Sequence, residues 1–596
     1  MIREERYMNT FRKAASALLA MAMLSACGTS SAAASTAEPA GKFTPGTYDA
    51  TAAGRNGDVT LHVTFDANSI TDITSDNAET DGIGTTAIEE LTKQTLENQA
   101  VPADTVSGAT ISSNAYLEAL KDAITQAGGD PESMVSTAAA STEEAADYVT
   151  DADIIIVGAG AAGMTAAVTA GNAGASVVLL EKSGKTGGNT PAAANGINAA
   201  DSEVQLADET YTSANASAAG LEELQLQNEE ARENLVDAFA ENSGEVINWL
   251  SDDLGVEFET DIQEDPRNPV TNYYMLQARK DGSTGITLTN AVAKALENTD
   301  VNLYTNMTAH DLVQDENGTV TGVVATDANG NDVTFTGKAV LLATGGFGKN
   351  QELLAEVAPR LANATTDEIA PTTGDGLLMA EAVGAKTVDL DQIQTFPVVA
   401  EGYGMVTPNK LPGGFQVDAI VVNDNAERFA PEGFEMVDAV LSQPDGNAYM
   451  IFDEGALNDD IQNMIDGGYI QEAGTAEELA VKLNLDPDTL RNTVDAYNED
   501  VADGTDDAFG KEGAQTLEGN LYGFKYGVGA HYFMGGVLIN ENTQVLDENE
   551  NPIPGLYAAG EVTGGFHGTQ RIDGSGIGDS FVFGRIAGRT IGENVK

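Results

Sequence analysis

The chain has 596 residues, which is too long for one hydrophobic core, so several domains are expected. Its 93 acidic and 29 basic side chains give a formal net charge of −64, which repels the phosphates of nucleic acids. Nucleic-acid binding is therefore excluded.

The N-terminus has the order of an export signal. After a basic pair, the apolar stretch Ala14–Leu24 is too short for a permanent membrane helix. The segment Leu24–Cys27 resembles a bacterial lipobox, in which the cysteine is acylated and becomes the mature N-terminus. We therefore expect residues 1–27 to be a lipoprotein signal peptide, with the exported protein lipid-anchored through Cys27 to the outer face of the bacterial cell membrane. The alternative is a buried helix with an incidental cysteine.

Composition divides the next part of the chain into linkers and a small domain. Segments rich in Ser, Ala and Thr predict linkers at 28–45 and 129–150. Between them, residues 46–128 alternate apolar and polar side chains around 59–65 and then change to helical periodicity near 87–96 and 116–124. This pattern predicts a small α+β domain.

The segment Asp104–Thr110 of this domain matches the D-x-x-[ST]-G-A-T pattern of FMN-binding domains. In that family FMN is joined through its phosphate to the threonine hydroxyl, so the resemblance implies covalent FMN at Thr110, with Ser107 in the binding motif and a flavin transferase acting during maturation. A helix that follows the motif would offer its N-terminal amides to the phosphate. The alternative is a Ser/Thr-rich helix cap.

A dinucleotide-binding pattern opens the rest of the chain. The apolar strand 153–157 precedes Gly158, Gly160 and Gly163, with a helix expected to begin near Met164. The first glycine permits a tight turn, the second lets a pyrophosphate approach the backbone, and the third packs the helix on its strand. A second strand, 176–180, ends at Glu181, whose carboxylate can accept the ribose hydroxyls of the adenosine.

Four further segments, at 182–190, 343–347, 373–376 and 560–565, follow in order. Together they resemble the fumarate reductase and succinate dehydrogenase flavoprotein family over 151–596, and most closely its flavocytochrome-type fumarate reductases and urocanate reductases. The resemblance implies non-covalent FAD. It assigns these further residues to the cofactor: Lys182, Gly187, Gly188, Asn189, Thr190, Thr344, Gly345, Asp375, Glu561, Gly576 and Ile577.

The same resemblance implies an α/β fold. A Rossmann-like FAD-binding domain would be formed by 151–389 and 531–596, and an α+β capping domain at 390–530 would be inserted between these parts. The small FMN-binding domain would precede them.

Members of this family reduce the double bond of an α,β-unsaturated acid by hydride transfer from the flavin and proton delivery from the opposite face. Cationic groups are needed at the carboxylate, where charge builds as the hydride adds. Arg571 corresponds to the arginine that binds this carboxylate, and His531 to the substrate-binding histidine. Outside such a family, a lone arginine or histidine is more often structural.

Two departures from the family bear on the second carboxylate of fumarate. Phe396-Pro397-Val398 stands where fumarate reductases have His-Pro-Thr, and Leu411-Pro412 stands where they have Thr-Glu. Phe396, Leu411 and Phe415 would line that end with carbon. We therefore expect a mono-carboxylate with an apolar or aromatic tail.

A third departure concerns the proton donor. Met436 stands in the place of the family's acid arginine, and methionine cannot donate a proton. Arg428 matches a structural arginine and is not a replacement. Tyr532, Tyr403 and Lys410 each carry a transferable proton, and the sequence gives no geometry for them.

The leading hypothesis is an extracytoplasmic reductase of an enoate, with electrons passing from a membrane donor through FMN to FAD. A ketosteroid-type dehydrogenase or reductase, which uses tyrosines, is an alternative: Arg571 weighs against it, whereas Met436 and Tyr532 keep it open. A non-enzymatic electron-relay lipoprotein is a third hypothesis, and it leaves the cap unexplained.

Overall fold

The computed structural model describes residues 42–595, except for 56, 80–83, 103–109, 135–147, 194, 208–215, 260–273, 279, 281, 407–418, 433–435, 503–505, 507 and 512. Several expectations lie outside the described residues. They are the signal peptide with Cys27, most of the first linker, Ser107, and the cap positions Lys410, Leu411, Pro412 and Phe415.

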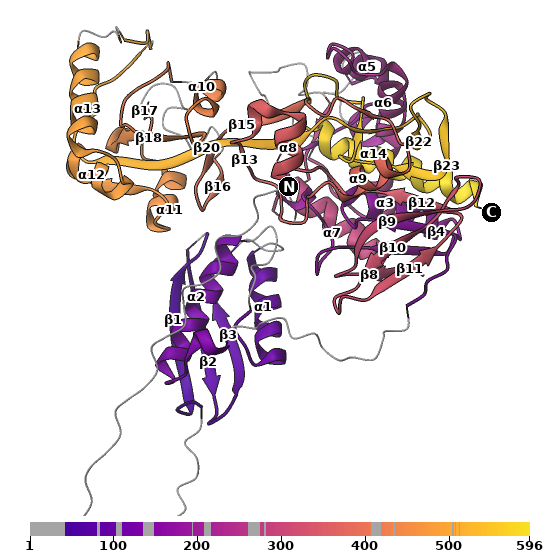
Figure 1. Cartoon of the computed structure of the whole chain (residues 1–596), viewed down its shortest axis with the longest axis horizontal. Helices are drawn as coiled ribbons and strands as arrows, with labels where there is room; N and C mark the ends of the chain where they lie inside the picture. Colours follow the sequence, from indigo (N-terminus) through magenta and orange to yellow (C-terminus); the bar gives the residue numbers. More distant parts are fainter. Residues whose placement is uncertain are drawn as a thin grey trace, which may run out of the picture.

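The N-terminal domain is a three-stranded antiparallel sheet covered by two helices (Figure 1). Its elements are β1 (Gly46–Ala53), β2 (Asp58–Phe65), β3 (Ile70–Asp76), α1 (Gly84–Asn98) and α2 (Thr110–Gln126). Along β2 the side chains Val59, Leu61, Val63 and Phe65 are buried in alternation, as the period of a strand requires. These residues and the inner faces of both helices form a core of their own.

The first linker ends earlier than the sequence suggested. Phe43, expected in the linker 28–45, is buried in the core of the N-terminal domain, with its ring 4.8 Å from that of Phe65. The second linker also begins later than expected, because the short 3₁₀ helix Pro131–Met134 packs on the same core. An aromatic or apolar side chain within a polar segment can still be buried in the nearest core. The average composition of the segment does not reveal it.

The main domain has a six-stranded sheet of order β22-β23-β12-β4-β5-β8, parallel except for β22. Its strands are β4 (Ile154–Val157), β5 (Val177–Leu180), β8 (Asn302–Tyr304), β12 (Ala339–Leu342), β22 (Gln544–Leu546) and β23 (Pro552–Ala558). Helix α3 (Ala161–Asn172) begins three residues before the expected Met164 and packs against the C-terminal helix α14 (Ser575–Asn594). The two parts of the domain, distant in sequence, are thereby joined.

Smaller elements complete the main domain. A separate sheet contains β9 (Thr308–Gln314), β10 (Val320–Thr326) and β11 (Asp332–Thr336). The other helices are α4 (Glu203–Leu206), α5 (Ala218–Gln225), α6 (Glu233–Asn248), α7 (Thr284–Leu296), α8 (Gln351–Val357) and α9 (Asp375–Ala382). Short strands are β6 (Ile197–Asn198), β7 (Met275–Leu276), β14 (Thr387–Val388), β21 (Gly536–Leu538) and β24 (Thr563–Gly564).

The cap is a seven-stranded sheet with helices, and it lies beside the main domain (Figure 1). Its strands are β13 (Thr365–Thr366), β15 (Ile393–Ala400), β16 (Gly404–Met405), β17 (Ala419–Val422), β18 (Asn447–Asp453), β19 (Gln471–Ala473) and β20 (Leu521–Phe533). Its helices are α10 (Val437–Leu441), α11 (Asp459–Asp466), α12 (Ala476–Leu483) and α13 (Pro487–Val501).

Strand β20 crosses the boundary expected between residues 530 and 531. It runs for 13 residues as the shared strand of the cap sheet and ends at Phe533 beside the main domain (Figure 1). Its antiparallel pairing with β15 extends on both sides of this boundary, with an irregularity at His531, which lies between the paired residues Ala530 and Tyr532. His531 and Tyr532 therefore lie on a strand that both domains share.

No helix in the described part of the chain is long and apolar enough to cross a membrane.

Candidate active site

An open cleft, whose empty space of about 820 Å³ includes solvent at its mouth, lies where β4, β5 and β12 end, at the carboxyl edge of the parallel sheet. Among the predicted cofactor residues, those that line it are Gly158, Gly160, Glu181, Lys182, Gly188, Asn189, Thr190, Thr344, Gly345, Asp375 and Glu561. They come from segments more than 400 residues apart, which the fold brings to one edge.

The three glycines after β4 differ in what surrounds them. Gly158 has φ +101°, and a Cβ there would lie 2.3 Å from the carbonyl oxygen of Ala343. A Cβ on Gly160 would meet nothing within 4 Å, so the cleft is open at this backbone. A Cβ on Gly163 would lie 1.9 Å from the carbonyl oxygen of Gly158, so this glycine packs the helix on its strand and does not line the cleft.

Polar groups at the cleft fit an adenine dinucleotide. Glu181 is buried at the end of β5, and its carboxylate accepts hydrogen bonds from the amides of Ala159 and Ser183, each at 2.8 Å. Carboxylate oxygens held in this way keep lone pairs for ribose hydroxyls. The hydroxyl of Thr344 is buried without a partner among the described residues, as expected for a group that awaits a ligand. The residues present therefore fit FAD.

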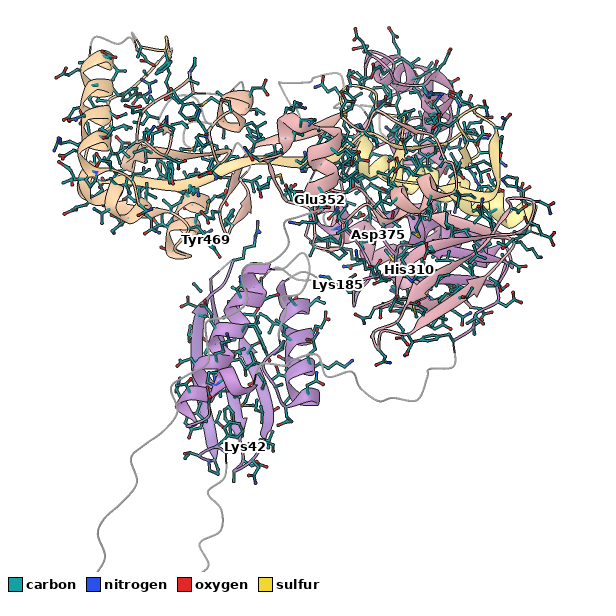
Figure 2. All side chains as sticks on the ribbon, in the orientation of Figure 1. Lys42, Lys185, His310, Glu352, Asp375 and Tyr469 are labelled. Atoms are coloured by element: carbon teal, nitrogen blue, oxygen red, sulfur yellow. The ribbon has the colours of Figure 1, made fainter. Side chains whose placement is uncertain are left out.

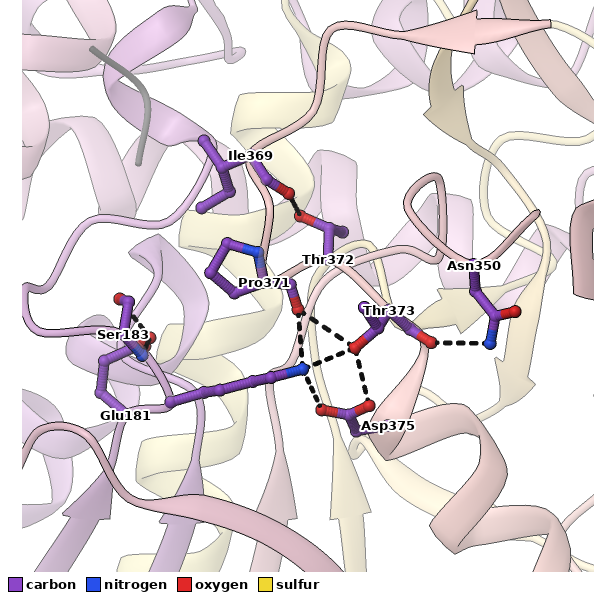
Figure 3. Close-up of polar contacts among 9 residues, drawn as sticks. Glu181, Ser183, Asn350, Ile369, Pro371, Thr372, Thr373 and Asp375 are labelled. Carbon is purple, nitrogen blue, oxygen red and sulfur yellow. Dashed lines mark hydrogen bonds and ion pairs between the residues drawn. The ribbon is translucent and has the colours of Figure 1, made fainter. Parts of the chain in front are cut away.

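Lys182 lines the cleft and also binds three groups at its rim, on Pro371, Thr373 and Asp375, which Figure 3 labels. Its Nζ donates to the hydroxyl of Thr373 at 2.6 Å, to the carboxylate of Asp375 at 2.9 Å and to the carbonyl of Pro371 at 3.4 Å. Asp375 is the first residue of α9. Lys182 thus ties the end of β5 to the loop that begins α9.

Arg571 and His531 are each held by a partner from another element. The Nε of Arg571 donates to Oε1 of Gln394 on β15 at 2.7 Å, and its guanidinium lies over the Tyr532 ring at 4.8 Å. The Nδ1 of His531 pairs with Asp367 at 2.8 Å. Next to His531 lies the ring of Phe396, 5.7 Å between centroids, in place of the family's polar group.

Tyr532, His567 and Asp579 form a buried polar cluster beside Arg571. The hydroxyl of Tyr532 donates to Asp579 at 3.2 Å and lies 3.2 Å from Nε2 of His567. Burial raises the pKa of Asp579 to about 8, and burial together with the nearby cation of Arg571 holds the pKa of His567 well below its usual value. At neutral pH the histidine is neutral and the aspartic acid carries a proton.

Glu561 lines the cleft and forms a pair of buried carboxyl groups with Glu368. Glu368 accepts from the amide of Gly348 at 2.8 Å, and Glu561 from the amide of Phe533 at 3.1 Å. Burial and the neighbouring carboxylate of Glu561 raise the pKa of Glu368 well above its usual value. The pair therefore keeps a proton to a higher pH than two separate, exposed carboxyl groups would.

The remaining predicted residues take different places. Gly187 has φ +115° and shapes the turn before the cleft without lining it. Gly576 and Ile577 are also absent from the lining, and a Cβ on Gly576 would lie 2.7 Å from the Tyr532 ring, so this glycine makes room for Tyr532. Thr110 is the first residue of α2, and its side chain lies outside the described part.

The candidate proton donors lie in different parts of the fold. Met436 is buried beside α10, and Arg428 is fixed by Glu432 and Asp506, each at 2.7 Å, in agreement with a structural role. Tyr403 lies under the guanidinium of Arg55 from the N-terminal domain. Of the described candidates, only Tyr532 contacts Arg571 directly.

Five residues at this site escaped the sequence reasoning: Asp367, Glu368, Gln394, His567 and Asp579. Two of them carried a signal. His567 is one of only four histidines, and Asp579 is a carboxylate within an otherwise apolar, glycine-rich stretch of α14. A carboxyl group among apolar neighbours needs a hydrogen-bond partner or a bound proton, so it indicates a functional site or a polar network.

Comparison with protein families matches the FAD binding domain over residues 153–577 and the FMN-binding domain over 54–125. A urocanate reductase of Eggerthella lenta is 33% identical over 563 residues, covering 91% of each chain. The chain belongs to the fumarate reductase flavoprotein family. Its cofactors are FAD and FMN.

Two further similar proteins bear on the class of substrate. A vinyl phenol reductase of Lactiplantibacillus plantarum is 30% identical over 487 residues, covering 73% of this chain and 95% of that one. The open conformation of a flavocytochrome c3 fumarate reductase matches with a TM-score of 0.68 and 30% identity, over 75% of this chain and 79% of that one.

Proposed function

We propose that this protein is a flavin-dependent reductase of an α,β-unsaturated mono-carboxylic acid with an aromatic or apolar tail. The observation that carries the proposal is Arg571, which is held by Gln394 and stacked on Tyr532. Its positive charge acts on Glu561, which lines the FAD cleft. The urocanate reductase relative supports the reaction class. The Phe396 ring on His531 supports the apolar tail.

Arg571 is suited to hold the carboxylate of the substrate. Gln394 fixes the Nε edge, while Asp573 makes only a long contact of 3.5 Å with Nη2. The guanidinium therefore keeps N–H groups for a carboxylate, to which it can donate two parallel hydrogen bonds. FAD, once reduced, supplies the hydride. Arg571 and His531 stabilise the negative charge that develops toward the carboxylate.

We assign the proton to Tyr532, because Met436 offers none. The tyrosine hydroxyl contacts both Asp579 and His567, so a proton given to the substrate can be replaced from the protonated aspartic acid. This cluster also supports the ketosteroid-type alternative, which uses tyrosines. Arg571 argues for the enoate, since a steroid ketone has no carboxylate to occupy a guanidinium.

The test is oxidation of a reduced viologen by the purified holoprotein with enoates, vinyl phenol and 3-ketosteroids as acceptors. Turnover of the enoates alone supports the proposal. Preferred turnover of a 3-ketosteroid would establish the alternative, and vinyl phenol turnover equal to that of the enoates would remove the role given to Arg571. Reduction of none of the acceptors would favour the electron-relay hypothesis.

Activity is expected to fall as the pH rises through about 8, because Asp579 then loses the proton that it supplies. Its folded-state pKa lies above the ordinary 3.8, so the proton stabilises the fold at low pH and this stabilisation is lost as the pH rises through about 8. Asp579→Asn should flatten both profiles, measured as kcat and melting temperature against pH.

Tyr532→Phe should lower kcat by roughly 10²-fold or more with KM little changed. An unaltered kcat in Tyr532→Phe would exclude Tyr532 as the donor.

Electrons are proposed to enter through FMN esterified to Thr110, at the N-terminal end of α2. Expression with a flavin transferase should add the mass of FMN less one water to the denatured chain, and Thr110→Val should abolish the addition. Ser113, on the same helix, offers a matched control, since Ser113→Ala should keep the flavin. An unmodified mass of the parent chain under these conditions would refute the covalent link.

The membrane donor and the outer-face location are also proposals, and they rest on the sequence of residues 1–27. Cys27→Ser should move the protein from the membrane to the soluble fraction or block its processing. The readouts are fractionation and the N-terminal mass. Identical fractionation and mass in the variant would show that no lipid is attached there.

A further inference from the structure

An arginine of the N-terminal domain touches the cap. Arg55, in the turn between β1 and β2, places its guanidinium 5.0 Å from the centre of the Tyr403 ring, which packs edge-on against Tyr469 at 5.3 Å. Figure 2 shows Tyr469 on the side of the cap that faces the N-terminal domain. A guanidinium over an aromatic face contributes roughly 0.5–1 kcal/mol at exposed sites and more when desolvated.

A second contact joins the N-terminal domain to the rim of the FAD cleft. Glu90 on α1 faces the loop of Gly184 and Lys185, where a Cβ on Gly184 would lie 3.4 Å from a carboxylate oxygen of Glu90. Burial lowers the pKa of Lys185, and the charge of Glu90 opposes this shift. The loop lies between Lys182 and Gly188, which both line the cleft.

The arginine contact is connected to the proposed site of FMN attachment. Both the amide of Arg55 and the hydroxyl of Ser112 donate to the carboxylate of Glu79, each at 2.6 Å. Ser112 lies in the first turn of α2, two residues after Thr110. The end of the domain that would carry FMN is therefore the end that meets the cap.

We propose that Arg55 and Glu90 form a two-point docking surface through which the N-terminal domain rests on the cap and on the FAD-cleft rim at once. Docking then presents the Thr110 end of α2 to the FAD cleft. The inference rests on the proposed electron path. In the docked arrangement FMN, once reduced by the external donor of the proposed function, would pass two electrons to FAD and be oxidised. Protons would be exchanged with water.

The docking can be tested without flavin chemistry by carbodiimide coupling, which joins lysine amines directly to carboxylates in contact. The dilute holoprotein should yield a Glu90–Lys185 cross-link, detected by peptide mass mapping. The pair Lys386–Glu550, at 2.7 Å, serves as an internal reference. Because docking needs both points, Arg55→Glu should remove the Glu90–Lys185 link and leave the Lys386–Glu550 link. Arg55→Lys should retain both links.

Arg491→Glu is the matched control for charge reversal, because Arg491 lies in the cap with a half-exposed side chain and pairs with Asp488 and Glu477. It should keep the Glu90–Lys185 link. Absence of this link in the parent chain, or its persistence in Arg55→Glu, would overturn the two-point docking.

A kinetic comparison separates the docking from the electron path. Arg55→Glu should slow reduction of FAD by FMN about tenfold or more, because the N-terminal domain then contacts the FAD cleft only transiently. In the Thr110→Val background, where a viologen reduces FAD directly, Arg55→Glu should leave turnover unchanged. Loss of the cross-link without slower FAD reduction would overturn the functional role of docking. An FMN-loaded chain whose FMN never reduces FAD would instead refute the electron path.

Discussion

Arg571→Met is expected to lower turnover of the preferred enoate by at least roughly 10²–10³-fold, the usual effect of removing one preorganised donor from a developing charge. The variant should retain FAD, because Arg571 does not line the cleft. Its guanidinium contacts Gln394 and Tyr532 instead. The measurements are steady-state kinetics with a reduced viologen and the flavin absorbance of the purified protein.

Two variants control this experiment. Arg571→Lys keeps the positive charge but loses the planar pair of donors, so it should recover only part of the activity. Arg589→Met makes the same substitution further along α14, where the arginine pairs with Glu245, and it should leave turnover unchanged. Wild-type kcat/KM in Arg571→Met would show that the carboxylate binds elsewhere.

The FAD cleft was largely predictable from the sequence because its requirements are local. A short apolar strand, a glycine that must adopt positive φ and a carboxylate after the next strand follow one another at fixed spacing. The structure brings Gly158, Gly160 and Glu181 to one cleft, with Gly163 packed as the pattern indicated. Each of these features depends on neighbours within the chain segment itself.

The proton-donating cluster could not be predicted in the same way, because its members meet only through tertiary packing. Tyr532 lies on β20, His567 in the loop before α14, and Asp579 within that helix. Their spacing in sequence follows no helical or strand period. The pKa of Asp579 likewise depends on burial that only the folded protein creates. The continuous strand β20 was missed for a related reason, since its pairing with β15 is long-range.

The fold explains the effect of Phe396, which departs from the family pattern: its ring contacts His531. It lies on β15 opposite Gly529 of β20, so its side chain reaches His531, two residues farther along β20. A ring at this position offers no donor to a second carboxylate. It offers instead an apolar surface against which an aromatic tail can pack.

We therefore expect cinnamate-type acids to be reduced far faster than fumarate. A buried carboxylate without donors costs several kcal/mol, and about 1.4 kcal/mol corresponds to a tenfold change, so discrimination of roughly 10²–10³-fold is expected in kcat/KM. An aryl tail avoids this cost and gains about 25 cal/mol for each Å² of apolar surface that it buries. Acceptors should include fumarate, acrylate, urocanate and a cinnamate-type acid.

Phe396→His identifies the origin of this preference. It restores the donor that fumarate reductases carry at this position, so the ratio of fumarate to cinnamate turnover should rise by roughly tenfold or more. Phe396→Leu removes the ring without adding a donor, and it should weaken cinnamate turnover while leaving fumarate poorly reduced. Acrylate, which has one carboxylate and no tail, should respond least to either change. If the parent enzyme prefers fumarate, or if Phe396→His and Phe396→Leu shift the ratio equally, then Phe396 does not select the substrate.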